Sequence, residues 1–257
     1  MKERETSSDK TLSIIDLFTP DRPQWTIEEA AAVLGMSQST VYRYFRSLAA
    51  AGLIFSVFPG RYLLGPGIIQ YERQLRNSDP LYRAARPTLE ALASPLGERG
   101  ILFIARIYRD HLMPMFEQPL GVERFPSSFE RGKLMPVNET APALAILAHR
   151  PIRSLRKMLR IEEDPQDWPR DRWTNLKRIL RAVRTSGYSV TNAPDDTGIY
   201  ISVPLLHPDG MVAGSLTFGT DPDGTSEPYL IACAQKLKAA SEQIARDLLG
   251  ETDAVTQ

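Results

Sequence analysis

The sequence predicts an α+β protein in two parts, a winged helix-turn-helix followed by a larger domain, and three observations lead to this prediction. Between residues 10 and 66, three short helical patterns with a tight turn before the third are followed by two strand-like runs. Gly65-Pro66-Gly67 and then Asp79-Pro80 interrupt the pattern on either side of a single helix. In residues 79–250, helices bracket strand-like segments, which is typical of an antiparallel sheet with helices packed on it.

Two short helices open the first part. The first helix ends at Pro20. In the segment "TIEE", the Thr26 hydroxyl can accept a hydrogen bond from the backbone of Glu29 while the Glu29 side chain reaches back, and this capping box begins the second helix. Gly35 ends that helix. The apolar residues that define the two helices are Leu12, Ile14, Ile15, Leu17 and Phe18 in the first and Ile27, Ala30, Ala31 and Leu34 in the second.

The third helix carries two regular stripes of side chains. Ser37 caps this helix after the turn Gly35-Met36, and the helix ends near Gly52. One stripe is apolar with the spacing i, i+3, i+4, i+7, so it forms a single face that packs on a core. The other stripe has the same spacing but points away from the first, so it faces either a partner or water. The apolar stripe is Val41, Tyr44, Phe45 and Leu48, and the second stripe is Ser39, Tyr42, Arg43 and Arg46.

A β-hairpin is expected directly after the third helix. Its two strands, 53–58 and 61–65, are joined by the turn pair Pro59-Gly60, and Arg61 lies just past this turn. No acid occurs between residues 30 and 71, although the chain holds 31 acids and has a formal net charge of zero. This window is therefore locally basic.

These features together predict a DNA-binding surface. A recognition helix presents polar side chains to the bases while its opposite face packs on its own domain. Arginine donates bidentately to guanine or neutralises phosphates, and hydroxyl and amide groups near the helix start suit base or phosphate contacts. The alternative is a surface helix with solvated arginines, and the capped helix, the turn and the basic hairpin favour DNA binding over it. The expected contact residues are Ser37, Gln38, Ser39, Thr40, Tyr42, Arg43, Arg46 and Arg61.

The remainder of the chain predicts a linker helix and an α+β domain. We expect a disordered tail at 1–9, the winged helix-turn-helix at 10–66, the linker helix at 67–78, the α+β domain at 79–250 and a second tail at 251–257. A loop is expected through Gly132 to Pro136. Within the domain, the expected helices are about 80–93, 140–149, 151–160, 171–186 and 226–249, and the expected strands are about 100–108, 112–118, 188–191, 199–206 and 211–219.

Composition and motifs exclude several classes of protein. No apolar run approaches the roughly 20 residues needed to span a bilayer, and the first ten residues lack the apolar segment of a secretory signal, so we expect a cytoplasmic protein. Cys233 is the only cysteine, which excludes an internal disulfide, and its place among alanines predicts a core position. The three histidines lack metal-ligand spacing, and no nucleotide, metal or nucleophile motif occurs. We therefore expect no cofactor, no metal and no catalysis.

The alternative function is an enzyme. In that case the α+β domain would process a small metabolite, and the winged helix would mediate protein contacts.

Several segments resemble the IclR family of bacterial transcriptional regulators. "TLSIIDLF", "TIEEAAAVLGMSQSTVYRYFRSLAAAGLI" and "GRYLLGPGI" are similar to its N-terminal domain, and "RGKLMPVNETAPALAILA", "SGYSV" and "ISVPLLHPDGMVAGSLTF" are more loosely similar to its C-terminal part. The resemblance covers about residues 10–250. The positions of the N-terminal pattern are filled by Ser39, Thr40, Val41, Arg43, Leu48, Gly52, Tyr62, Leu64 and Gly65.

The resemblance implies a ligand-responsive regulator of catabolic genes, a repressor or an activator. It implies a GAF-like effector-binding domain at 79–250 that takes small organic molecules, often carboxylic acids or aromatic catabolites. It also implies dimers or tetramers on palindromic operators. Residues 68–78 would supply the dimer seam, with Ile68, Ile69, Tyr71 and Leu75 as its apolar residues.

The resemblance also places an effector pocket between residues 136–145 and the strands of residues 199–218. Ala141 and Ala143 would lie at a helix start, where free backbone N–H groups favour a carboxylate, and Tyr200 and Thr217 would point into the same cavity. Pro142 removes one donor and Ala143 replaces the usual glycine, so the effector is expected to be bulkier, aromatic or less acidic than a simple keto acid, or the pocket to be degenerate. Core packing is the alternative role for these four residues.

A basic run follows the expected pocket helix. Its cations are followed closely by Glu162, Glu163 and Asp164, so a solvated helix face is expected, with a second nucleic-acid surface as the alternative. The cations are Arg150, Arg153, Arg156, Lys157 and Arg160.

Overall fold

The computed structural model describes residues 6–123, 125–137, 139–161, 168–194, 197–207, 209–223 and 225–255. The chain divides after Ser78 into two compact units, Met1–Ser78 and Asp79–Gln257, and each is described by itself. Several features of the sequence analysis lie outside the described residues. They are residues 1–5 of the expected tail, the three acids Glu162, Glu163 and Asp164, the turn residue Pro208, and residues 256–257.

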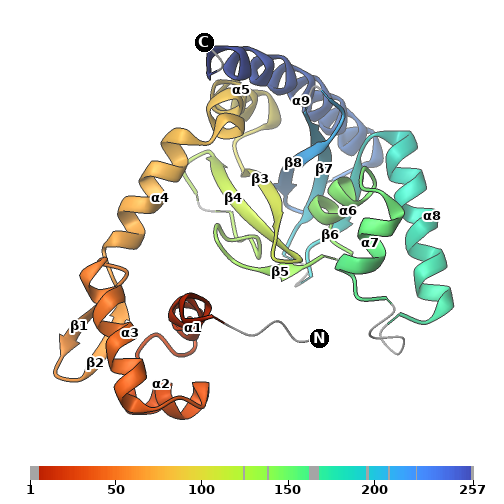
Figure 1. Cartoon of the computed structure of the whole chain (residues 1–257). Helices are drawn as coiled ribbons and strands as arrows, with labels where there is room; N and C mark the ends of the chain where they lie inside the picture. The colour runs from red at the N-terminus through yellow and green to blue at the C-terminus, as the bar shows by residue number, and fades with distance from the viewer. Residues whose placement is uncertain are drawn as a thin grey trace. The chain divides into compact units, whose positions relative to one another are not determined.

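The first unit contains the predicted helix-turn-helix and hairpin (Figure 1). The two strands of the hairpin pair antiparallel, with Ile54 opposite Leu64 and Ser56 opposite Tyr62. This arrangement confirms the winged helix-turn-helix. The elements are α1 (Ser7–Ser13), a 3-10 turn (Ile15–Leu17), α2 (Ile27–Leu34), α3 (Gln38–Ala50), β1 (Ile54–Phe58), β2 (Arg61–Leu64) and α4 (Gly67–Ser78).

One face of each of the first helices forms the core of this unit. Phe45, in the middle of α3, has no exposed surface, and Val41 and Leu48 are buried beside it. Tyr44 is half-buried against the same cluster. The apolar stripe predicted for α3 is therefore confirmed. The other buried members of the cluster are Ile14, Phe18, Trp25, Ala30, Ala31 and Ile54.

The expected terminal tails are shorter than the sequence analysis proposed. Helix α1 already begins at Ser7, because the Thr6 hydroxyl accepts a hydrogen bond from the Asp9 amide at 3.2 Å and the Asp9 carboxylate accepts one from the Thr6 amide at 2.8 Å. This capping box satisfies amide groups that a helix start otherwise leaves free. At the other end, α9 (Glu227–Val255) continues past residue 250. Both tail boundaries are corrected accordingly.

The second unit is a six-stranded antiparallel sheet with helices, which confirms the α+β class. The strand order is β5-β4-β3-β8-β7-β6, and every neighbouring pair is antiparallel. The elements are α5 (Pro80–Leu96), β3 (Gly100–Tyr108), β4 (His111–Leu120), β5 (Met135–Pro136), α6 (Ala141–Leu147), α7 (Ile152–Met158), α8 (Arg170–Ser186), β6 (Ser189–Asn192), β7 (Ile199–Leu206), β8 (Val212–Thr220) and α9.

Helices cover both faces of this sheet, and each face has its own core (Figure 1). Side chains alternate between the faces along each strand, so Leu102 and Ile104 contact the core under α5 and α9, whereas Phe103 and Ala105 contact the core under α6, α7 and α8. Cys233 is buried in the first of these cores, which confirms its predicted position.

One segment expected as loop is a strand. Met135 and Pro136 form the short edge strand β5, which pairs with Leu112 and His111 of β4. Two residues are too few to show the alternation by which a strand is predicted from sequence. None of the described helices combines the length and the apolar character needed to cross a lipid bilayer.

Candidate nucleic-acid interface and ligand cavity

A tight turn sets the geometry between α2 and α3. Gly35 ends α2 with a φ of 62°, in the left-handed region that glycine adopts at little cost, and the Met36 amide donates to the Ala31 carbonyl at 3.0 Å. Ser37 then caps α3, because its hydroxyl accepts from the Thr40 amide at 3.3 Å and lies 2.8 Å from the Thr40 hydroxyl. The two hydroxyls therefore hold the start of the helix together.

The second stripe of α3 is exposed along its whole length. Ser39, Tyr42, Arg43 and Arg46 are all exposed, and 53% of the Tyr42 surface is accessible. Neither arginine forms an ion pair with any residue that the structure describes. Of the other predicted contact residues, Ser37, Gln38 and Arg61 are exposed and Thr40 is half-buried. The structure thus brings all eight residues to the α3–hairpin part of the first unit.

The hairpin is tied to α3 through one aromatic residue. The Tyr62 amide donates to the Trp25 carbonyl at 2.9 Å and the Trp25 amide to the Tyr62 carbonyl at 3.1 Å, so the segment before α2 pairs with the hairpin. The Tyr62 ring meets the Phe45 ring edge-on at 4.9 Å. The position of Arg61, one residue before Tyr62, is therefore fixed relative to α3.

Glu29, the last acidic residue in the sequence before this surface, is already engaged. The amide of Thr26 donates to the Glu29 carboxylate at 3.0 Å, and this hydrogen bond lowers the pKa of Glu29, with the positive charges of Arg22 and Arg61 adding to the effect. Arg22 also lies 3.4 Å from Glu29. Because no acid follows until Glu72, the electrostatic potential over α3 and the hairpin is set by the arginines.

The four residues expected to line an effector pocket are packed inside the second unit. Ala141 and Ala143 lie in the first turn of α6, as expected, and Tyr200 and Thr217 lie on the sheet face that α6 covers. All four are fully buried. The Ala141 amide is not free for a ligand, because it donates to the Thr191 hydroxyl at 2.9 Å. Core packing therefore describes these four residues in this structure.

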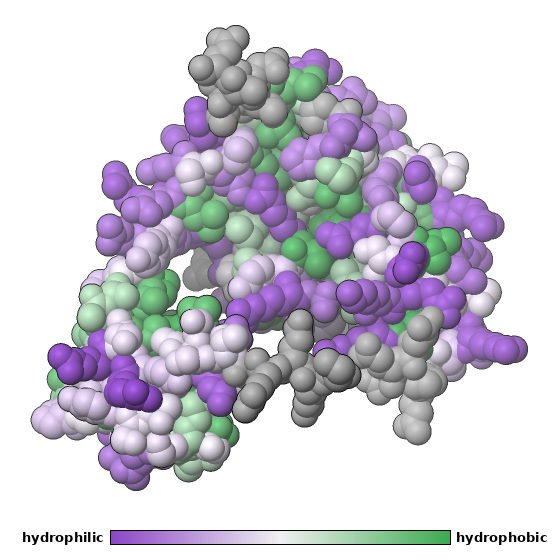
Figure 2. All heavy atoms as spheres, viewed as in Figure 1, coloured by the Kyte–Doolittle hydropathy of each residue, from purple (hydrophilic) through white to green (hydrophobic). Residues whose placement is uncertain are grey.

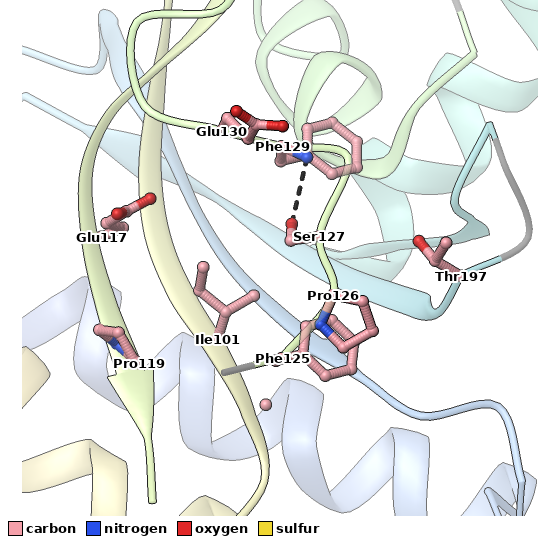
Figure 3. Close-up of a pocket in the computed structure, with 10 residues that line it drawn as sticks. Ile101, Glu117, Pro119, Phe125, Pro126, Ser127, Phe129, Glu130 and Thr197 are labelled. Carbon is pink, nitrogen blue, oxygen red and sulfur yellow. Dashed lines mark hydrogen bonds between the residues drawn. The ribbon is translucent and has the colours of Figure 1, made fainter. Parts of the chain in front are cut away.

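A cavity of about 380 Å³ opens beside this core, next to β3, β4 and the loop after β4 (Figure 3). The side chains of Glu117, Ser127 and Glu130 give it polar groups, and two phenylalanines and two prolines give it apolar walls. Neither carboxylate forms an ion pair with a residue that the structure describes. Its lining consists of Gly100, Ile101, Glu117, Pro119, Phe125, Pro126, Ser127, Phe129, Glu130 and Thr197.

Tyr200 stands directly behind the wall of this cavity. Its hydroxyl lies 3.0 Å from the hydroxyl of Ser127, which also accepts from the Phe129 amide at 3.1 Å. The Tyr200 ring packs edge-on against Phe129 at 4.6 Å and against Phe125 at 6.4 Å. Of the four predicted residues, Tyr200 alone contacts the cavity lining through these interactions.

Sequence reasoning missed the residues that form the cavity and the residues that fix the hairpin. The loop after β4 has no periodic pattern, and only the spacing of Phe125 and Phe129 marks it as buried. Trp25 pairs with Tyr62 through an isolated bridge and is not part of a strand, so no strand pattern in the sequence predicts this pairing. Among the described residues, no group of three or more His, Cys, Asp or Glu side chains lies close enough together to hold a metal.

Comparisons with known proteins agree with this geometry. Residues 7–55 match the family model of the IclR helix-turn-helix domain. The HTH-type transcriptional regulator KipR of Bacillus subtilis is 21% identical over 96% of this chain and 99% of its own length. Two crystal structures share the fold. An IclR transcriptional regulator from Alicyclobacillus acidocaldarius has a TM-score of 0.77 and 20% identity, and the match covers 96% of this chain and 100% of that one. An IclR homologue from Microbacterium hydrocarbonoxydans complexed with 4-hydroxybenzoate has a TM-score of 0.74 and 19% identity, and the match covers 95% of this chain and 100% of that one.

Proposed function

We propose that this chain, which belongs to the IclR family, is a transcriptional regulator that binds duplex DNA through α3 and the hairpin and responds to a small organic effector. One observation carries the proposal. Arg43 and Arg46 are exposed on the face of α3 opposite its buried stripe, directly after a capped helix and a tight turn, and neither pairs with a carboxylate in the described part of the chain. An exposed cationic face held rigidly by its own domain is what major-groove recognition requires.

The contact residues divide by chemistry into two groups. Arg43 and Arg46 can donate two parallel hydrogen bonds to guanine, and Ser39 and Tyr42 can hydrogen-bond to bases or phosphates. Arg61 at the hairpin suits a phosphate or the adjacent minor groove. Ser37, Gln38 and Thr40 lie at the helix start, where backbone and hydroxyl groups suit a phosphate.

DNA binding is proposed to require at least a dimer on a palindromic operator. One winged helix with three arginines covers few base pairs and neutralises few phosphates, so a monomer would bind weakly. Helix α4 supports a seam at residues 67–78: it buries no residue within its own unit, and Ile69, Tyr71 and Leu75 are exposed, Ile69 to 72%. Exposed apolar side chains in one helix are typical of a protein interface.

The effector site is proposed to be the 380 Å³ cavity beside Tyr200, within the domain that we assign to residues 79–250. Its size and its aromatic walls suit a small aromatic molecule. Glu117 and Glu130 disfavour a simple carboxylate there, because two anions would face a third. We therefore propose a neutral or cationic aromatic effector, in contrast to the 4-hydroxybenzoate bound by the Microbacterium homologue. Control of catabolic genes would follow from such an effector.

The DNA-binding part is tested by selecting duplexes from a random library with the full-length protein. We expect enrichment of an inverted repeat whose half-site centres lie about one helical turn, or a multiple of it, apart. Failure to enrich any sequence at physiological salt would contradict the proposal.

The effector part is tested by thermal unfolding with benzylamine, benzyl alcohol and benzoate. We expect benzylamine and benzyl alcohol to stabilise the protein, each by about 2.7 kcal/mol when present at 100 times its dissociation constant. At the same concentration, benzoate should stabilise the protein less. At equal concentration, benzylamine should stabilise the protein more than benzyl alcohol does, because its cation faces the carboxylates of the cavity. Glu117→Gln should remove this difference. Benzoate as the strongest ligand in both proteins would contradict this choice of effector.

A further inference from the structure

A second cavity, of about 280 Å³, lies between the end of α6, the start of α7 and one face of α8. It shares no lining residue with the cavity beside Tyr200, and its chemistry is opposite. Figure 2 shows that the face formed by α7 and α8 is largely hydrophilic with small apolar areas. The lining consists of Leu147, Ala148, Arg150, Ile152, Leu155, Lys177, Leu180, Arg181 and Arg184.

Four cations line this cavity, and none of its described lining residues is an acid. Arg150, Lys177, Arg181 and Arg184 form no ion pair with any residue that the structure describes. The Lys177 ammonium lies 5.6 Å from the centre of the Trp173 ring. By contrast, other arginines of the same unit, such as Arg106 and Arg99, are paired with carboxylates. Among the residues that the structure describes, no carboxylate therefore offsets the positive charge of this cavity.

The three cations of α8 repel one another along one face of the helix. Lys177, Arg181 and Arg184 stand at i, i+4 and i+7, and like charges at such spacings destabilise a helix. Arg184 also acts on a neighbour: burial lowers the pKa of His149, and the positive charge of Arg184 lowers it further. A bound anion would relieve this repulsion.

The floor of the cavity is apolar. Leu147, Ala148, Leu155 and Leu180 line the cavity together with the cations, and all four are buried. Contact with nucleic-acid backbone needs only an exposed basic surface, whereas an apolar floor contributes to binding only when the ligand has an apolar part that enters it. A volume of 280 Å³ limits that ligand to a small molecule.

We propose that this cavity binds a small amphiphilic phosphate monoester, with the apolar group on the leucine floor and the phosphate among Arg150, Arg181 and Arg184. A carboxylate carries a single negative charge and would leave most of the positive charge of the four side chains unneutralised. A phosphate monoester carries two negative charges above its second pKa near 6, so it neutralises more of that charge. Guanidinium groups bind phosphate oxygens through paired hydrogen bonds. Of the basic run after α6, Arg150 thus has a ligand-binding role.

The test titrates the full-length protein with phenyl phosphate and with inorganic phosphate at pH 7.5, followed by calorimetry. We expect phenyl phosphate to bind at least about tenfold more tightly than inorganic phosphate, because only phenyl phosphate uses both the floor and the cations. Equal affinity for phenyl phosphate and inorganic phosphate would overturn the role of the floor and hence the proposal.

Variants then locate the site. Arg181→Gln and Arg184→Gln should each weaken phenyl phosphate binding about tenfold or more. Arg178→Gln is the matched control, because Arg178 lies on the same helix, does not line the cavity and is hydrogen-bonded to Asn175 at 2.9 Å. It should leave the affinity unchanged.

Two results with these variants would also overturn the proposal. One is equal weakening by all three variants, which would indicate a diffuse charge effect over α8. The other is loss of duplex DNA affinity in Arg181→Gln and Arg184→Gln without any binding of phenyl phosphate, which would assign the surface to nucleic acid.

Discussion

Arginine has two different roles in this chain, and its neighbours decide which. Arg106 forms a two-pronged pair with Asp79, which is 6% exposed, and Asp79 also caps α5 by accepting from the Tyr82 amide at 3.1 Å. Such an arginine is structural. Arg43, Arg46, Arg181 and Arg184 have no carboxylate partner among the described residues, and their charge is available to a ligand.

His149 should make the stability of the protein fall in mild acid. Burial and the charge of Arg184 hold its pKa in the folded state below the ordinary value of about 6.5. As the pH falls from 7 towards 5, the unfolded chain therefore takes up a proton before the folded protein does, and the free energy of unfolding decreases. Below the pKa of His149 in the folded protein, the decrease in the free energy of unfolding is complete.

Urea unfolding at pH 7 and pH 5 measures this effect. In His149→Gln the decrease should be smaller than in the unchanged protein, and in Arg184→Gln it should be intermediate, because one of two causes is removed. The same decrease in all three proteins would show that other groups govern the acid response.

At the scale of elements, periodic segments were predictable and irregular contacts were not. The two stripes of α3 follow from spacing alone, and β7, an almost continuously apolar segment, was expected at the bounds it has, Ile199–Leu206. The loop that contributes Phe125 and Glu130 to the cavity has no period, so its fold depends on tertiary contacts such as the one between Ser127 and Tyr200.

The four expected effector residues illustrate the same limit. The family resemblance placed Ala141 at a helix start, and the structure agrees; it placed Tyr200 facing a cavity, whereas Tyr200 is fully buried on the sheet face that α6 covers. Whether a cavity exists there depends on how large side chains pack. The rings of Phe103 and Phe129 fill the space around Tyr200, and sequence alone does not specify such packing.

The junction of the hairpin with α4 depends on close backbone contact. A Cβ atom on Gly65 would lie 2.2 Å from the Gly52 carbonyl oxygen and 3.0 Å from the Ile54 amide nitrogen. Gly65→Ala should therefore lower the free energy of unfolding of the first unit by about 1–3 kcal/mol. Gly250→Ala is the control, because outside its own helix no described atom lies within 4 Å of its Cβ position and helical glycine tolerates alanine. Equal stability of both variants in thermal unfolding would show that the junction adjusts freely.

At the scale of the whole molecule, oligomerisation should depend on α4. Ile69→Asp together with Leu75→Asp places charges on side chains that are exposed within the first unit, so the fold should survive while the dimer dissociates. Analytical ultracentrifugation should then show monomers, and affinity for a two-half-site duplex should fall. Gln70→Asp, on another side of the same helix, is the control. A wild-type monomer at micromolar concentration that binds a single half-site tightly would contradict the proposed dimer.

The affinity of Arg43→Ala and Arg46→Ala for the selected duplex, at about 0.15 M salt, tests the central claim that the exposed stripe of α3 reads DNA. Both side chains lie opposite the buried stripe, so the free energy of unfolding should change by no more than about 0.5 kcal/mol. Loss of a base contact should cost roughly 1–3 kcal/mol of binding per half-site and relax specificity at one position, whereas loss of a phosphate contact should weaken all sequences alike and flatten the salt dependence. Phe45→Ala, the core control, should instead lower stability by about 3–5 kcal/mol. Wild-type affinity in both arginine variants would show that the stripe is only a solvated surface.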